Sequence, residues 1–286
     1  MSIYGRMVKF EHSILALPFT LTALLLAHRV TPVTPRLVFL IIMAVVWARS
    51  AAMGFNRLVD APWDAHNPRT SMREIPAGNI SNRETIVFVY VSSFLFSLSA
   101  LAISLKCFWF SFPVLLVLFS YSYTKRFTWL SHLVLGFGQA LAPLGVWLAV
   151  TGELSLKISI LSITLATYMA GLDILYACQD IECDRRDGLF SLPANLGIKR
   201  ALGLSVLMHT FTFISLLALY WAFGLSPFFL LFVIIIGGLL IAEHRLVTPN
   251  DLTHINFAFF HINTAISLLL LAAMFVEELI RKIPPL

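Results

Sequence analysis

Apolar residues dominate long runs of this chain, and short polar segments separate the runs. Each run has roughly 17–25 residues, the length that an α-helix needs to cross the hydrocarbon core of a membrane. The pattern predicts an all-α protein, a polytopic membrane bundle of nine transmembrane helices. Their expected limits are 12–28, 37–57, 85–105, 107–123, 130–150, 156–179, 201–222, 226–242 and 255–279. Because the runs are spread evenly, we expect one integral membrane domain over residues 1–286.

The composition agrees with this interpretation. Hydrophobic residues make up 59% of the chain and charged residues 12%, whereas a soluble domain is roughly one quarter charged. The net charge of +5 comes from basic residues in the connections, so we expect a lipid bilayer around the protein and no nucleic-acid partner. The three cysteines have no disulfide or metal-site spacing. The first run lacks a small-residue cleavage site and is predicted to be a helix rather than a signal peptide.

The distribution of Lys and Arg predicts the orientation. Six basic residues fall on one side of the predicted spans, Arg49 lies within a span, and thirteen fall on the other side: Arg6, Lys9, Arg57, Arg69, Arg73, Arg83, Lys125, Arg126, Arg185, Arg186, Lys199, Arg200 and Arg245. The positive-inside rule places the more basic side in the cytoplasm. We therefore expect an inner (cytoplasmic) membrane protein whose N-terminus and 57–84 and 180–200 loops face the cytoplasm.

Carboxylates recur at helical spacing on the same side. Asn56, Asp60 and Asp64 are four residues apart, and so are Asp180 and Asp184. Residues at this spacing stay near one face of a helix, and Asp173 and Tyr176 fall on the stripe of the second pair. A single carboxylate at a helix end is usually a solvated cap. Two facing pairs of oxygen ligands instead suit Mg²⁺, which commonly shares its coordination with substrate phosphates.

The two acidic pairs also suggest an internal duplication. Each pair is followed by a Pro-Ala dipeptide, Pro76-Ala77 after the first and Pro193-Ala194 after the second. This echo predicts two four-helix pseudo-repeats plus a ninth helix.

Basic side chains accompany the acids. The segment NPRTSMREIPAG contains Arg69 and Arg73, and YSYTKRFT contains Lys125 and Arg126. Proteins commonly bind diphosphate with a metal ion together with Arg and Lys side chains. Any one of these cations could instead anchor its loop at the membrane surface. A diphosphate site inside an apolar bundle suits a prenyl diphosphate.

The motifs resemble those of a known family. FNRLVDAPWDAHNPRTSMREIPAG is similar to the first signature of the UbiA-type intramembrane prenyltransferases, and DILYACQDIECDRRDG is similar to the second. YSYTKRFT resembles the Tyr/Lys-Arg segment between them. One departure is that Arg57 follows Asn56, where many members have Asp.

The resemblance implies a Mg²⁺-assisted transfer of a polyprenyl group from polyprenyl diphosphate to an aromatic carbon. Its implied metal ligands are Asn56, Asp60, Asp64, Asp180 and Asp184. Arg69, Arg73, Lys125 and Arg126 would neutralise the leaving diphosphate, Lys125 being counted with the catalytic residues. The rings of Tyr121, Tyr123 and Tyr176 would face the allylic cation, and Asp173 would polarise or deprotonate the acceptor.

The acceptor remains a choice between two aromatic acids. The run RSAAMGFNRLVD resembles the branch that prenylates 1,4-dihydroxy-6-naphthoate on the futalosine route to menaquinone. The alternative is 4-hydroxybenzoate, which leads to ubiquinone. Arg49 lies seven residues before Asn56, so we expect it either to bind the acid's carboxylate or to pair with Asp173.

A transporter is the alternative from another class. Transporters place polar residues and Gly/Pro breaks near the membrane midplane. Gly136, Gly138, Pro143 and Gly145 fit that pattern, but they also fit a tight helix contact. The histidines show no metal-site spacing, and the oligomeric state is not predicted.

Overall fold

The computed structural model describes residues 3–281, and the regular secondary structure in this range is helical, joined by loops, with one isolated bridge between Thr248 and Asp251. The long helices are α3 (Pro35–Asp64), α4 (Asn82–Ile103), α5 (Leu105–Thr124), α6 (Ser131–Thr151), α7 (Leu156–Ala177), α10 (Ile198–Phe223), α11 (Pro227–Leu246) and α13 (Asn263–Arg281). The short elements are α1 (Ile3–Met7), the 3₁₀ helix η1 (Phe10–Leu15), α2 (Leu17–His28), α8 (Ile181–Arg186), α9 (Leu192–Leu196), α12 (Ile255–Phe257) and the π-helix η2 (Ala258–Ile262).

The prediction of an all-helical membrane bundle is confirmed. Eight helical segments of the described chain are long and apolar enough to cross a membrane, the last running from Ile255 to Arg281. The first predicted segment, 12–28, is divided between η1 and α2. The 12 residues of α2 extend only about 18 Å, less than a hydrocarbon core of about 30 Å. Pro18 explains this late start, because proline is accommodated in the first turn of a helix.

Capping residues set the helix ends that the apolar runs alone did not define. Ser104 separates α4 from α5, with an extended backbone and a side chain that accepts a hydrogen bond from the Cys107 amide. The boundary expected at residue 106 therefore lies two residues earlier, at Ser104. Ser81 and Glu84 form a capping box at the start of α4, in which each side chain satisfies a free amide of the first turn.

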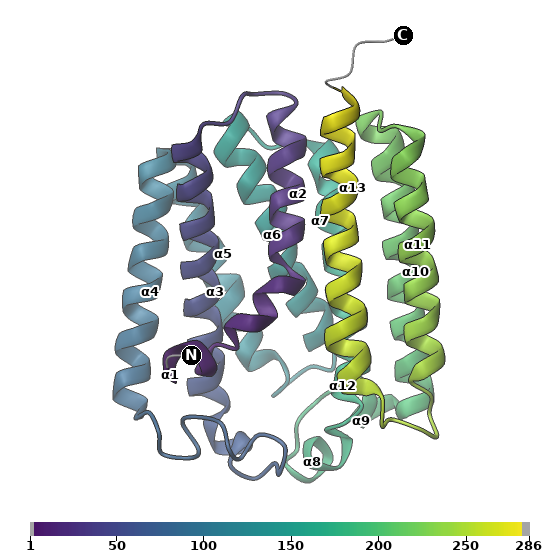
Figure 1. The fold of residues 1–286 in the computed structure, drawn as a ribbon. Coiled ribbons are helices and arrows are strands. Elements are labelled where there is room, and N and C mark those ends of the chain that lie inside the picture. Colours follow the sequence, from purple (N-terminus) through teal and green to yellow (C-terminus); the bar gives the residue numbers. More distant parts are fainter. Residues whose placement is uncertain (1–2, 282–286) are drawn as a thin grey trace.

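The helices form one bundle (Figure 1). At one side α3 packs along α4 and α5, and at the other α10, α11 and α13 lie together, with α2, α6 and α7 between them. The predicted pseudo-repeat relates the pair α3 and α4 to the pair α7 and α10, and both pairs are extensively packed. Large apolar side chains such as Trp109, Leu116, Trp221 and Ile234 are exposed on the outside. Lipid rather than water would meet this surface.

The glycines of α6 allow close helix packing. A Cβ on Gly136 would lie 2.3 Å from the backbone oxygen of Ala166 in α7, so this position admits only glycine without a shift of one helix. Pro143 lies within an α6 that continues to Thr151. The tight-contact interpretation is therefore confirmed at Gly136, and α6 is a continuous helix rather than the unwound helix of a transporter.

The connections that carry the motifs gather at one end of the bundle. The 65–81 loop, the 178–197 segment with α8 and α9, and α1 all lie at the lower end in Figure 1. The two aspartate pairs, which are more than 100 residues apart in sequence, thus face the same region.

Candidate active site

Two adjoining cavities occupy the interior near this end. A polar cavity of about 670 Å³ is lined by both aspartate pairs and by the loop cations. An apolar cavity of about 450 Å³ runs between α2, α3, α5 and α6. Arg49, Asn56, Tyr121 and Gln139 line both, so a ligand with a polar head and an apolar tail can occupy the two together.

The first acidic group lies on the last turns of α3, as the spacing predicted. Asp60 and Asp64 are buried, with exposed fractions of 3% and 6%. Lys125 donates to Asp60 at 2.8 Å, and Arg73 donates to both oxygens of Asp64 at 2.7 Å. Asn56 donates from its amide nitrogen to Asp60 at 3.0 Å. In this geometry Asn56 positions the Asp60 carboxylate.

The second acidic group comes from a helix break rather than a continuous stripe. The helix α7 ends at Ala177, and Asp180 is the N-cap residue of the separate helix α8, which contains Asp184. The expectation that Asp173, Tyr176, Asp180 and Asp184 share one helical stripe is therefore wrong. The break redirects the chain, so Asp180 and Asp184 line the polar cavity from a different element.

Arg69 and Asn67 hold Asp180 from the opposite loop. The Arg69 guanidinium binds both carboxylate oxygens of Asp180, at 2.9 and 2.5 Å, and Asn67 donates to the same group at 2.9 Å. Arg69 also donates to the Tyr176 hydroxyl at 3.2 Å and lies over its ring. Burial raises the pKa of Asp184, the neighbouring charge of Asp180 adds to this, and a hydrogen bond with Ser191 opposes it.

Asp173 forms a pair that sequence reasoning missed. Its carboxylate lies 2.7 Å from Nδ1 of His132 on α6. Because the Leu192 amide donates to the other ring nitrogen at 3.3 Å, the proton must be on Nδ1, and His132 donates it to Asp173. The two residues are 41 positions apart on neighbouring helices, and no spacing in the sequence signals the contact.

Arg49 is not the partner of Asp173. It donates to the backbone oxygen of Lys9 at 3.2 Å, and its buried Nε has no hydrogen-bond partner among the described residues. The predicted Arg49–Asp173 pair is therefore wrong, because His132 occupies that carboxylate. A buried guanidinium N–H without a partner is costly, and this one lies at the junction of the two cavities.

Two predicted substrate contacts lie elsewhere. Within residues 3–281, neither Tyr123 nor Arg126 lines either cavity. Arg126 stacks on Trp63 at 4.2 Å and on Tyr123 at 4.8 Å, and donates to the backbone oxygen of Val59 at 3.0 Å. Arg126 thus fastens the end of α5 to α3, whereas Tyr121 and Tyr176 do line the polar cavity.

The unusual Arg57 has a structural partner. It is buried and donates to the backbone oxygen of Met7 in α1 at 3.2 Å. The residue at which the sequence departs from the resembled signature therefore ties the N-terminal helix to α3.

The donor set fits a hard divalent cation. Within the described part of the chain, Asp60 Oδ1 is buried without a hydrogen-bond partner, and the four aspartates supply only oxygen ligands. Three of these carboxylates pair with Lys or Arg instead. Such cations can shift to the phosphate oxygens of a ligand while a metal takes the carboxylates.

Comparison with known proteins decides the family. Residues 16–265 match the UbiA prenyltransferase family. The chain belongs to this family. It is 32% identical over 244 residues to 4-hydroxybenzoate octaprenyltransferase of Vibrio cholerae, a match that covers 84% of each chain. The enzyme of the same name from Yersinia enterocolitica is 27% identical over 282 residues, covering 96% of each chain.

Solved structures of UbiA homologues share the fold. The apo structure of the homologue from Aeropyrum pernix superposes with a TM-score of 0.84 at 29% identity, covering 94% of this chain and 98% of that one. A homologue from Archaeoglobus fulgidus bound to GPP and Mg²⁺ has a TM-score of 0.69 at 20% identity, covering 96% and 99%. The protein is thus a multi-pass membrane prenyltransferase, as the motifs predicted.

Proposed function

We propose that this UbiA-family enzyme transfers a polyprenyl group from polyprenyl diphosphate to an aromatic acid, with Mg²⁺ as cofactor, in quinone biosynthesis. The observation that carries the proposal is the junction of the two cavities. The polar cavity combines acids and cations suited to a metal diphosphate, and the apolar cavity beside it suits the prenyl tail. We assign the whole chain, residues 1–286, to this one domain.

The diphosphate would lie between the two acidic groups. Asp60, Asp64, Asp180 and Asp184 are the proposed Mg²⁺ ligands, and Asn56 is proposed to complete the set after its amide turns. Bound Mg²⁺ supplies charge neutralisation at the phosphate oxygens. Arg69, Arg73 and Lys125 already reach this region and stabilise the same charge. Heterolysis of the allylic C–O bond then sends its electron pair to the diphosphate.

The allylic cation must react with a nucleophilic carbon of the acceptor, so water must be excluded from its surroundings. Tyr121 is proposed to face the cation, since it lines both cavities. The Tyr176 ring is already covered by Phe259, at a centroid distance of 4.1 Å, and by Arg69. Tyr176 is therefore better placed to hold Arg69 and the diphosphate than to meet the cation directly.

Asp173 is proposed to accept the proton that the aromatic ring loses after the C–C bond forms. The hydrogen bond from His132 fixes the carboxylate at the cavity wall. A general base must be held within hydrogen-bond reach of the proton that it removes.

The carboxylate of the acceptor is proposed to bind Arg49. An acid group at this point satisfies the buried Nε and leaves the ring at the cavity junction. The name shared by the relatives supports 4-hydroxybenzoate, and the resemblance of the 49–60 run supports 1,4-dihydroxy-6-naphthoate. The motif loops are proposed to face the cytoplasm, in agreement with the positive-inside rule.

A transfer assay in membranes tests the proposal. Membranes containing the chain, Mg²⁺ and a labelled polyprenyl diphosphate receive the two acids in parallel, and prenylated product is identified by mass. We expect product from one acid, and its loss with EDTA, Asp60→Ala or Asp180→Ala. Asp251→Ala, at an exposed loop position, is the matched control and should retain activity. Folded enzyme with Mg²⁺ that prenylates neither acid would refute the proposed acceptor class.

A further inference from the structure

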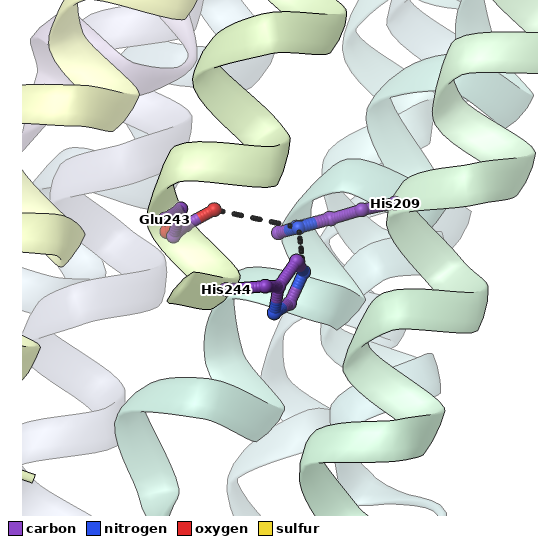
Figure 2. Close-up of side chains that lie close together, drawn as sticks. All are labelled: His209, Glu243 and His244. Carbon is purple, nitrogen blue, oxygen red and sulfur yellow. Dashed lines mark hydrogen bonds and ion pairs between the residues drawn. The ribbon is translucent and has the colours of Figure 1, made fainter. Parts of the chain in front are cut away.

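Three potential metal ligands meet on the far side of α7 from the two cavities. His209 on α10 and Glu243 and His244 on α11 converge, as Figure 2 shows. Their ligand atoms all lie within 4.8 Å of one another. Nδ1 of His209 is 2.9 Å from Nε2 of His244 and 3.4 Å from Oε2 of Glu243. The exposed fractions of His209 and Glu243 are 2% and 0%.

Hydrogen bonding alone leaves this cluster incompletely satisfied. His209 donates from Nε2 to the backbone oxygen of Tyr168 at 3.3 Å, so neutral His209 presents a lone pair at Nδ1. His244 can donate to that lone pair, but Glu243 Oε2 then has no donor. Among the described residues it indeed has no hydrogen-bond partner, because the 3.4 Å contact lacks hydrogen-bond geometry. An unpaired carboxylate oxygen at this depth is costly.

A metal ion would satisfy all three atoms at once. Two imidazole nitrogens and a carboxylate oxygen are ligands for divalent transition metals of the zinc class. Zn–N bonds of about 2.0–2.1 Å in a tetrahedron separate ligand atoms by roughly 3.3 Å, which is close to the 2.9 and 3.4 Å contacts here. We propose that His209, Glu243 and His244 bind one divalent transition-metal ion, at a site separate from the aspartates.

The surroundings resemble the outer shell of a metal site. The Tyr168 carbonyl fixes the His209 ring, and Asn263 donates to Oε1 of Glu243 at 2.6 Å, which leaves Oε2 for the metal. Gly171 makes room, since a Cβ there would lie 2.5 Å from the His209 ring. Within residues 3–281, Asn263 Oδ1 also lacks a hydrogen-bond partner.

The site adds polar contacts between helices that also share the apolar core. It binds α10 to α11 directly and reaches α13 through Asn263. The preceding π-helix η2 carries Phe259, which packs on Tyr176 of the polar cavity. A metal here would therefore stabilise the wall of the active site without touching substrate.

Metal binding by the whole purified protein tests the proposal. The protein is prepared with a tag that contains no histidine, stripped with EDTA, and titrated with Co²⁺ in excess Mg²⁺, which occupies the aspartate site. Visible absorption reports Co²⁺ bound by imidazole, and Zn²⁺ is used to displace it. We expect about one Co²⁺ per chain. Asn263→Ala should weaken binding by roughly 10–100-fold, as the loss of an outer-shell partner does.

Variants and a spectrum assign the ligands. Glu243→Gln and His244→Ala should lose the Co²⁺ absorption. The double variant Asp60→Ala and Asp180→Ala, and the control His254→Ala at an exposed position, should keep it. Thermal unfolding of every variant confirms that the protein is folded. The X-ray absorption spectrum of the zinc-loaded wild type, which needs no variant, should show imidazole and oxygen ligands. No saturable Co²⁺ in folded wild type, or absorption lost only with the aspartates, would overturn the proposal. The cluster would then be a hydrogen-bonded histidine pair beside a carboxylate that Asn263 holds.

Discussion

Replacement of Arg49 gives the sharpest test of how the acceptor is held. The wild-type side chain has five N–H donors, one of which binds Lys9 while the buried Nε is unpaired among residues 3–281. A carboxylate could accept from Nε and from a terminal nitrogen. At about 1.5–3 kcal/mol for each charged hydrogen bond, two bonds amount to roughly 3–6 kcal/mol. Arg49→Ala should then lower kcat/KM for the acid by about 10²–10⁴-fold.

The assay compares each acid with its methyl ester, which has the same ring but no negative charge. Arg49→Ala should weaken transfer to the acid far more than to the ester, and Arg49→Lys should recover part of the loss because it restores charge without the fork. Arg83→Ala, at an exposed position, is the control. Equal losses for acid and ester would show that Arg49 acts by holding the N-terminal segment, and the carboxylate assignment would be wrong.

Three further results are expected. His132→Ala should lower kcat by roughly 10–100-fold with little change in KM for the diphosphate, because Asp173 loses the hydrogen bond that orients it. His132→Asn should restore part of the lost kcat. An unchanged kcat in His132→Ala would show that His132 does not position Asp173. Gly136→Ala should destabilise the protein by about 1–3 kcal/mol in thermal unfolding, since its Cβ meets a backbone oxygen of α7. Gly203→Ala is the control, because a Cβ at Gly203 would meet no atom within 4 Å. Equal Tm values for Gly136→Ala and Gly203→Ala would refute the packing argument. Arg57→Ala should speed proteolysis of the N-terminal segment by removing its bond to α1, and unchanged cleavage would show that α1 is held otherwise.

The position of Arg57 shows how a departure from a motif acquires a meaning only in three dimensions. In the sequence it interrupts the pattern expected after Asn56. In the fold Arg57 donates to a backbone oxygen of α1, so it ties the N-terminal segment to α3 while lining the polar cavity. The first acidic group nevertheless keeps Asp60 and Asp64, each held by a cation from a different segment.

The sequence by itself determined the long apolar helices after the first predicted span, and the first acidic group. A helix imposes a period of 3.6 residues and a membrane imposes a length, so apolar runs and the spacing of Asn56, Asp60 and Asp64 are readable without coordinates. Local chemistry refined the ends, as Ser104 and Pro18 show. The motifs also led to the correct family, because two specific patterns occur in the right order.

Only the tertiary structure decided which side chains meet. The pairs Asp173 with His132 and Arg69 with Asp180 join segments 41 and 111 residues apart, and the cluster of His209, Glu243 and His244 joins two helices. The break at Cys178 also depends on packing, since nothing in the run up to Asp184 demands that the helix end there. Contacts between helices depend on register and rotation, which are set by many weak packing interactions rather than by any local signal.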